Sequence, residues 1–152
     1  MGSRVPEVID ALTALGRSEA RDQLADVLVS DGPEIAGDSG PDWLIVGFDG
    51  DPEGDMQAAQ TLGGWVGLGT RREEQWQVTV AAIASRGEKD IRDARMRVYE
   101  IGGRVEVWLA ADPSLGLVGV EAAIEASQLS QVQTGDGVQA VLLLTVAGRA
   151  FT

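Results

Sequence analysis

Two long strand patterns near the C-terminal end constrain the fold most, at residues 117–131 and 138–151. Thr134-Gly135-Asp136-Gly137 separates them, and a short Gly-rich turn of this kind is typical of a β-hairpin. The second pattern contains Leu142-Leu143-Leu144, which places apolar groups on both faces because side chains alternate along a strand. Such a strand is either central in its sheet or covered by a neighbouring subunit.

Two helices are expected from apolar spacings of three and four residues. The first covers Pro6 to Leu15, after which Gly16 weakens or ends it and residues 17–24 are ambiguous. Asp90 is a candidate N-cap for the second helix, which should finish near Ala111. The apolar stripe of this second helix consists of Ile91, Ala94, Val98, Ile101, Val105 and Trp108.

Further strands are expected between the two helices. Residues 26–30 and 75–85 show strand patterns, and Trp43 to Phe48 is an apolar run of the kind found when both faces of a strand are covered. Residues 61–69 form a possible strand, whose glycines suggest a bulge or a close backbone contact.

This order of elements predicts an α+β fold: a small mixed or antiparallel β-sheet with two helices packed on one face and a closing β-hairpin. The chain has 152 residues, 44% of them hydrophobic, which fits a single domain over residues 1–152.

The amino-acid composition excludes most kinds of catalytic site. The chain has no cysteine and no histidine, so thiol nucleophiles, Ser-His-Asp triads and zinc or haem sites of the usual kinds are excluded. Lys89 is the single lysine, and its surroundings are not a phosphate-binding loop. We therefore expect no enzyme and no cofactor. The net charge of −12 disfavours binding to nucleic acid and to anionic membranes.

The acidic turn at residues 49–55 invites a metal interpretation. Asp49, Asp51, Glu53 and Asp55 occupy positions 1, 3, 5 and 7 of a calcium loop, with Gly54 at position 6. The match then fails, because position 12 is Gln60 rather than a bidentate carboxylate and the preceding segment is strand-like. A solvated loop tip is the simpler interpretation. Glycoside cleavage would need one of these carboxyls in an apolar pocket, whereas four adjacent acids on a Gly-rich turn are expected to be ionised and exposed.

Four tryptophans are found among seven aromatic residues. Trp76 and Trp108 lie on apolar faces and are expected in the core. Trp43 and Trp65 flank the Gly-rich region and are expected either in the core or as interface anchors. Gly67 and Gly69 follow Trp65, but the third glycine of a dinucleotide-binding fingerprint is missing.

An ordered set of segments resembles the tail terminator (tail completion) proteins of long-tailed phages that infect actinobacteria. The segments are Val5 to Leu12, Val29-Ser30-Asp31-Gly32-Pro33, Asp42 to Asp55, Trp65-Val66-Gly67-Leu68-Gly69, Asp112-Pro113-Ser114-Leu115-Gly116 and the closing hairpin. The resemblance covers nearly the whole chain, and residues 17–24 are its divergent part.

The resemblance implies a non-enzymatic virion protein of the lambda type. It would form a homo-hexameric ring at the head-proximal end of the tail, assembled in the host cytoplasm. Its implied partners are the major tail tube protein and a neck or head-completion protein, while DNA passes through the ring without specific binding. No membrane partner is expected. The expected interface or lumen residues are Trp43, Asp49, Asp51, Glu53, Asp55, Trp65, Gly67 and Gly69.

Two alternatives stay open at this stage. One is another head–tail connector or neck protein, which would also be structural and small. The other, from a different class, is a small calcium-binding module built on the acidic turn.

Overall fold

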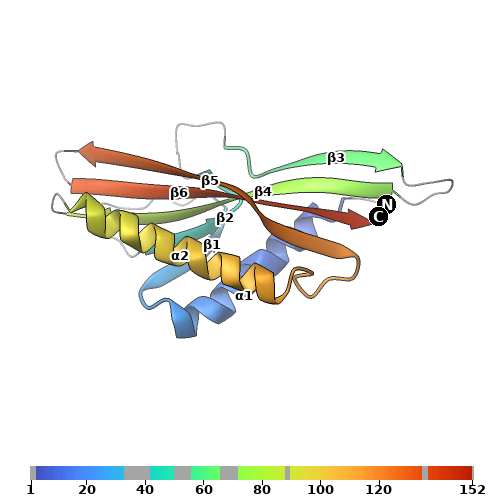
Figure 1. Cartoon of the computed structure of the whole chain (residues 1–152), viewed down its shortest axis with the longest axis horizontal. Helices are drawn as coiled ribbons and strands as arrows, with labels where there is room; N and C mark the ends of the chain where they lie inside the picture. Colours follow the sequence, from blue (N-terminus) through green and yellow to red (C-terminus); the bar gives the residue numbers. More distant parts are fainter. Residues whose placement is uncertain are drawn as a thin grey trace.

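The fold consists of one mixed β-sheet with two helices on one face (Figure 1). The computed structural model describes residues 3–32, 42–49, 56–65, 72–87, 90–134 and 137–151, without the side chains of 62–65, 72 and 134. The elements are α1 (Val5–Gln23), β1 (Val27–Asp31), β2 (Asp42–Val46), β3 (Ala59–Trp65), β4 (Arg72–Arg86), α2 (Ile91–Ala111), β5 (Val120–Thr134) and β6 (Gly137–Phe151). The expected α+β class is confirmed.

The sheet is organised around β4 and β6. Its strand order is β1-β2-β4-β6-β5, and β3 pairs with the part of β4 that β2 leaves open. Only the β1–β2 pair is parallel among the described strands, so the sheet is mixed. The closing hairpin is confirmed, since Thr134 of β5 pairs with Gly137 of β6. Because β6 lies between β4 and β5, Leu142-Leu143-Leu144 belongs to an interior strand.

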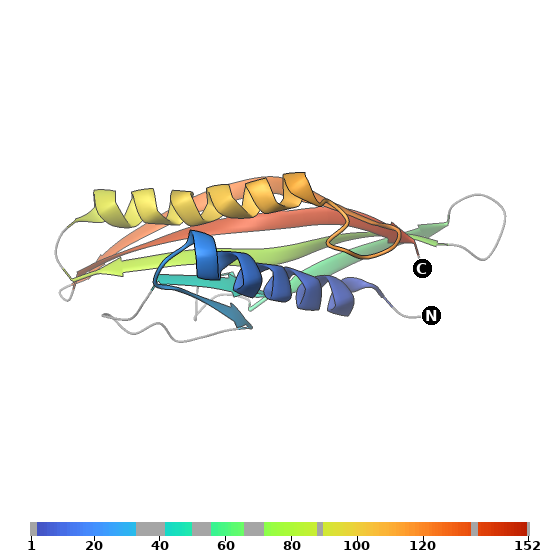
Figure 2. The same ribbon diagram turned by 90° about the horizontal axis from the view of Figure 1, so that it is seen from below.

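Both helices cover the same face of the sheet, as Figure 2 shows. Even-numbered residues of β4 and β6, from Trp76 to Ala84 and from Val138 to Val146, point into this helical layer and are buried. The predicted stripe of α2 packs against them: Ala94, Val98, Ile101, Val105 and Trp108 are buried, and Ile91 is partly buried. Core positions for Trp76 and Trp108 are therefore confirmed.

The predicted end of the first helix is wrong. Gly16 lies inside α1, which continues to Gln23 through the stretch that the sequence left ambiguous. A Cβ at Gly16 would lie 3.1 Å from Cγ1 of Val29. The glycine thus provides a notch for β1 and does not end the helix. Ala20 and Leu24 continue the buried face beyond it.

The start and end of α2 agree with the sequence. The Asp90 side chain accepts a hydrogen bond from the backbone N–H of Asp93 at 3.0 Å, which satisfies one of the free donors of the first turn. The helix ends at Ala111, where the N–H of Asp112 donates to the carbonyl of Trp108.

Adjacent glycines in α2 should respond differently to substitution. A Cβ at Gly102 would lie 2.7 Å from Cδ2 of Leu142, whereas a Cβ at Gly103 would meet nothing within 4 Å. We expect Gly103→Ala to raise the free energy of unfolding by about 0.5–1 kcal/mol, because alanine favours the helix. Gly102→Ala should give no gain, because Leu142 must move. Thermal denaturation of both variants measures the difference, and an equal gain in both would contradict the assigned faces.

Candidate interaction surfaces

A second apolar cluster lies on the face of the sheet opposite the helices. It contains Ile45, Phe48, Ala81, Ile83 and Val141, all buried, with Trp43 half-buried against them. On β2, Leu44 and Val46 belong to the helical layer while Ile45 belongs to this cluster, so both faces of the strand are apolar, as the sequence predicted. The indole Nε1 of Trp43 is buried and has no hydrogen-bond partner among the described residues.

The other expected site residues are only partly described. Asp49 follows β2 and the apolar cluster. Trp65 is the last residue of β3, where its backbone pairs with Arg72. Asp51, Glu53, Asp55, Gly67 and Gly69 lie outside the described residues. The structure therefore places Trp43 at the start of β2 and Asp49 beyond its end, and leaves the rest of the acidic turn as an expectation.

The elements on either side of the acidic turn argue against a calcium loop. Strand β2 precedes it and β3 follows it, whereas a calcium loop of the EF-hand type joins two helices. Gln60, at the twelfth position, pairs with Gln77 inside the sheet. We expect calorimetric titration with millimolar calcium to give no heat of binding. Saturable heat that disappears in an Asp49→Asn/Asp51→Asn variant would contradict this.

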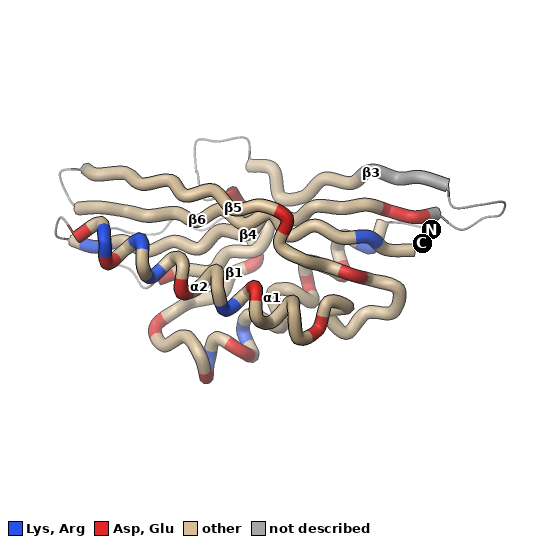
Figure 3. The backbone as a smooth tube through the Cα atoms, in the orientation of Figure 1, with Lys and Arg blue, Asp and Glu red and all other residues tan. Residues whose placement is uncertain are grey.

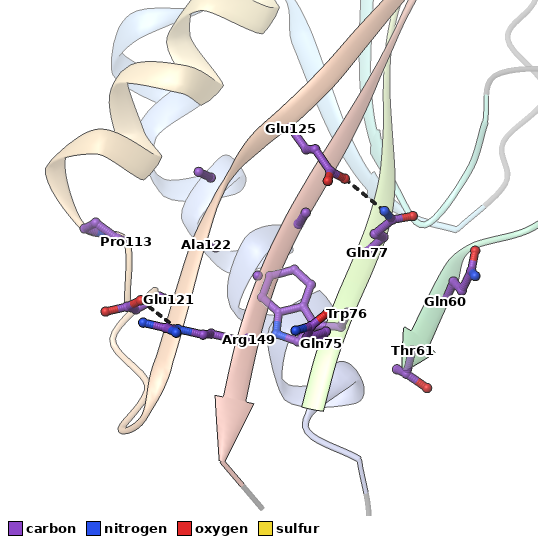
Figure 4. A pocket seen from close by; sticks show the side chains of 13 residues that line it. Gln60, Thr61, Gln75, Trp76, Gln77, Pro113, Glu121, Ala122, Glu125 and Arg149 are labelled. Atoms are coloured by element: carbon purple, nitrogen blue, oxygen red, sulfur yellow. Dashed lines mark hydrogen bonds and ion pairs between the residues drawn. The ribbon is translucent and has the colours of Figure 1, made fainter. Parts of the chain in front are cut away.

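A groove of about 710 Å³ lies across β3, β4, β6 and β5, at the end of the sheet away from the β2 cluster (Figure 4). Small residues line its centre: Ala123, Ala147 and Gly148. Polar side chains surround them: Gln60, Thr61, Gln75, Gln77, Glu121, Glu125 and Arg149. Alternation along the strands directs most of these side chains to the face that the helices leave uncovered.

Two polar links cross this groove (Figure 4). The amide of Gln77 on β4 donates to the carboxylate of Glu125 on β5 at 2.9 Å, passing over β6. Arg149 on β6 lies between Glu121, at 3.2 Å, and Glu73, at 3.6 Å. Amides and paired carboxylates offer hydrogen bonds to another chain. They do not form a nucleophile–base pair.

Sequence reasoning missed this groove, although its parts were visible. Gln75 and Gln77 alternate with buried residues in β4, and Glu121 alternates with Val120 and Ala122 in β5. The pattern shows which side chains share a face of one strand. It does not show that β5 and β4 both flank β6 in the register that brings Gln77 to Glu125. Among the described residues no group of three carboxylates is placed to hold a metal ion.

Among the described strands, β1, β3 and β5 lie at edges of the sheet, and the β3 and β5 edges lie on opposite sides of one ribbon. In the order β3-β4-β6-β5, β3 pairs only with β4 and β5 pairs only with β6 in the described part of the chain. β5 is 15 residues long and carries only two charged residues, Glu121 and Glu125. β3 carries none. Edge strands of monomeric proteins are usually protected by charges, prolines or covering elements, so these two edges are suited to pairing with another chain.

An ionic cluster fixes α2 to the sheet. Asp42, at the start of β2, is only 7% exposed. Its carboxylate accepts from Arg86 Nη1 at 2.9 Å and from Arg97 Nε at 2.8 Å. Arg97 also donates to the carbonyl of Ala25, which joins the α1–β1 connection to the same cluster.

Both arginines of this cluster hold their protons more tightly than usual. The pKa of Arg86 is raised above its ordinary value, chiefly by the hydrogen bond to Asp42. For Arg97, burial lowers the pKa, but hydrogen bonds to Asp42 and Glu100 outweigh that effect and raise it. Both arginines therefore stay charged near neutral pH, and the cluster has a structural role.

Comparison with known proteins adds no family assignment. Neither a scan against protein-family models nor a search of curated proteins found a match to this chain. Among the described residues, neither helix has the length and apolar character needed to cross a membrane.

Proposed function

We propose that this protein is a phage tail terminator: a ring subunit that closes the head-proximal end of a tail tube and joins it to the neck. The resemblance of the ordered segments to that family supports the proposal. The structure adds surfaces suited to subunit contacts, and the composition lacks the usual equipment for catalysis.

The observation that carries the proposal is the pair of open edges on β3 and β5. They lie on opposite sides of the same ribbon, so the β5 edge of one copy can pair with the β3 edge of the next. A contact between two different surfaces of the same chain forms a ring when its rotation closes and a filament when it does not. The number of six copies in such a ring is what the family resemblance implies.

Charge and polar surface fit the passage of DNA. The net charge of −12 repels phosphate groups, so a ring of these subunits would let DNA slide without holding it. The groove lies on the same ribbon as both edges and offers amide groups to a neighbouring subunit.

Substitutions on the β5 edge should prevent ring formation without unfolding the subunit. Gln128 and Ser130 are exposed on β5. We expect Gln128→Lys/Ser130→Lys to remove hexamers, because lysines on an edge strand oppose strand addition. Mass photometry of the free protein and electron microscopy of tail tubes incubated with it measure the effect.

Val118→Lys is the matched control, since Val118 is 89% exposed and lies outside the strands. The fraction of the Val118→Lys protein found in rings should equal the fraction for the unmodified protein. Normal rings in the double β5 variant would contradict β5 pairing. Virion labelling would separate a terminator from another neck protein, because a connector would be found away from the last tube ring.

A further inference from the structure

We propose that the exposed face of α2 is a self-association surface, on which two copies of this chain pair through antiparallel α2 helices. This surface is separate from the β3 and β5 edges. The proposal therefore does not depend on ring formation, and each can fail without the other.

The first observation is an apolar stripe on the solvent side of α2. Met96 is 56% exposed, Tyr99 49% and Val107 56%. Together with Gly103 and Ala110 they recur at spacings of three and four residues, so they follow one line along the helix. α2 already buries a different stripe against the sheet. Figure 2 shows the side of α2 away from the sheet, where no other described helix or strand covers it.

The second observation is a glycine that no close contact among the described residues of the subunit explains. Gly103 lies in the middle of the exposed stripe, and a Cβ there would meet nothing within 4 Å. Its neighbour Gly102 is explained by Leu142, but Gly103 weakens the helix without permitting any contact within the subunit. A second backbone or a ring from another chain can approach closely at such a notch.

The charges beside the stripe identify the partner as a second copy. Arg95 and Glu106 lie on one flank of the stripe, and Glu100 and Arg104 lie on the other. An antiparallel pair brings equal flanks together, which places Arg95 of one copy opposite Glu106 of the second, and Glu100 opposite Arg104.

The apolar residues fit the same register. Met96 of one copy falls opposite Val107 of the second, and Tyr99 falls opposite Gly103. In one antiparallel register, the two residue numbers of every facing pair have nearly the same mean. For these two pairs and the two charge pairs, that mean lies between 100 and 102. One arrangement therefore satisfies the apolar stripe, the glycine notch and both charged flanks.

The net charge of the molecule also favours α2 as the point of contact. The helix carries four arginines and three carboxylates, a net charge of +1, whereas the whole chain carries −12 (Figure 3). Two copies that approach through α2 thus meet less repulsion than the net charge of the whole chain would produce. One helix pair buries little area, so the dimer belongs to the weak, transient class, populated at roughly 100 μM.

Disulfide trapping tests the register directly, because the chain has no cysteine of its own. Met96→Cys and Val107→Cys subunits are prepared separately and mixed at about 100 μM under mild oxidation. We expect cross-linked dimers in the mixture and few in either variant alone. Identical positions lie 11 residues apart along the antiparallel pair, about 16 Å, which exceeds the reach of a disulfide.

Val118→Cys mixed with Met96→Cys is the control for random collision, since Val118 is exposed and lies off the helix. A yield in the Met96/Val107 mixture no higher than this control would overturn the proposal. Efficient cross-linking of each single variant with itself would overturn it as well, because that indicates a parallel pair.

Two further variants in the cross-linking background test the contacts. Gly103→Glu should reduce the rate of cross-linking at least tenfold, because its side chain fills the notch opposite Tyr99, while open space on its own subunit leaves the fold intact. Arg95→Glu should also slow the reaction, and Arg95→Glu/Glu106→Arg should restore it. Unchanged rates in Gly103→Glu, or no recovery in the double variant, would contradict this register.

Discussion

Gly148→Ala should lower the free energy of unfolding by about 3 kcal/mol or more, or prevent folding. A Cβ at Gly148 would lie 2.0 Å from the carbonyl oxygen of Glu121 on β5 and 2.5 Å from Cζ2 of Trp76. The carbonyl belongs to the backbone of a paired strand, so it cannot move without separating β5 from β6. Urea denaturation followed by tryptophan fluorescence measures the loss.

Gly103→Ala serves as the matched control, because the same change there meets open space. If Gly148→Ala denatured at the same urea concentration as the unmodified protein, the close contact among β6, β5 and Trp76 would be wrong. The residues that line the groove would then be arranged differently, because Gly148 and Trp76 are both among them.

Asp42→Asn should lower the free energy of unfolding by about 2–3 kcal/mol, since it removes the shared anion from two arginines that stay charged. Arg86 and Arg97 keep 28% and 17% of their side-chain surface exposed, so water screens part of the loss. The expected fall in melting temperature is about 5–10 °C. Asp93→Asn is the control: Asp93 also pairs with Arg86 but is 56% exposed, so its loss should stay below about 1 kcal/mol.

The raised pKa values of Arg86 and Arg97 fix the sign of the pH dependence. A cation whose pKa is higher in the folded state stabilises the fold fully below its unfolded pKa. That contribution is lost only as the pH rises through the folded value. Arginine keeps its proton far above neutral pH even in the unfolded chain, so the cluster should persist in alkali. The difference between Asp42→Asn and the unmodified protein should stay constant from about pH 6 to pH 10. A difference that shrinks toward pH 10 would contradict the cluster.

Local patterns predicted much of the fold. The second helix, its N-cap Asp90 and the closing hairpin follow from spacing, capping chemistry and turn composition, which act over a few residues. The end of the first helix was wrong, because Gly16 is explained by Val29 on β1 and not by anything beside it in the chain.

The interaction surfaces were harder to predict, because they depend on strand pairing. Trp43 was identified as a core or interface residue, and it lies half-buried on the helix-free face. The groove requires the register that aligns β4, β6 and β5, and the open edges require knowing that β3 pairs with β4 alone. No single segment of the sequence carries a pattern that predicts the groove or the open edges. The sequence identified the buried stripe of α2, but it did not identify the exposed stripe at Met96, Tyr99 and Val107.

Mass photometry of the protein, alone and after incubation with isolated tail tubes, tests the central claim most directly. We expect a species of six times the 16.0 kDa chain, free or as a ring at one end of each tube, that the β5 double-lysine variant fails to form. A chain that stays monomeric in solution and leaves the tubes unbound would contradict the proposal that it is a ring-forming tail terminator.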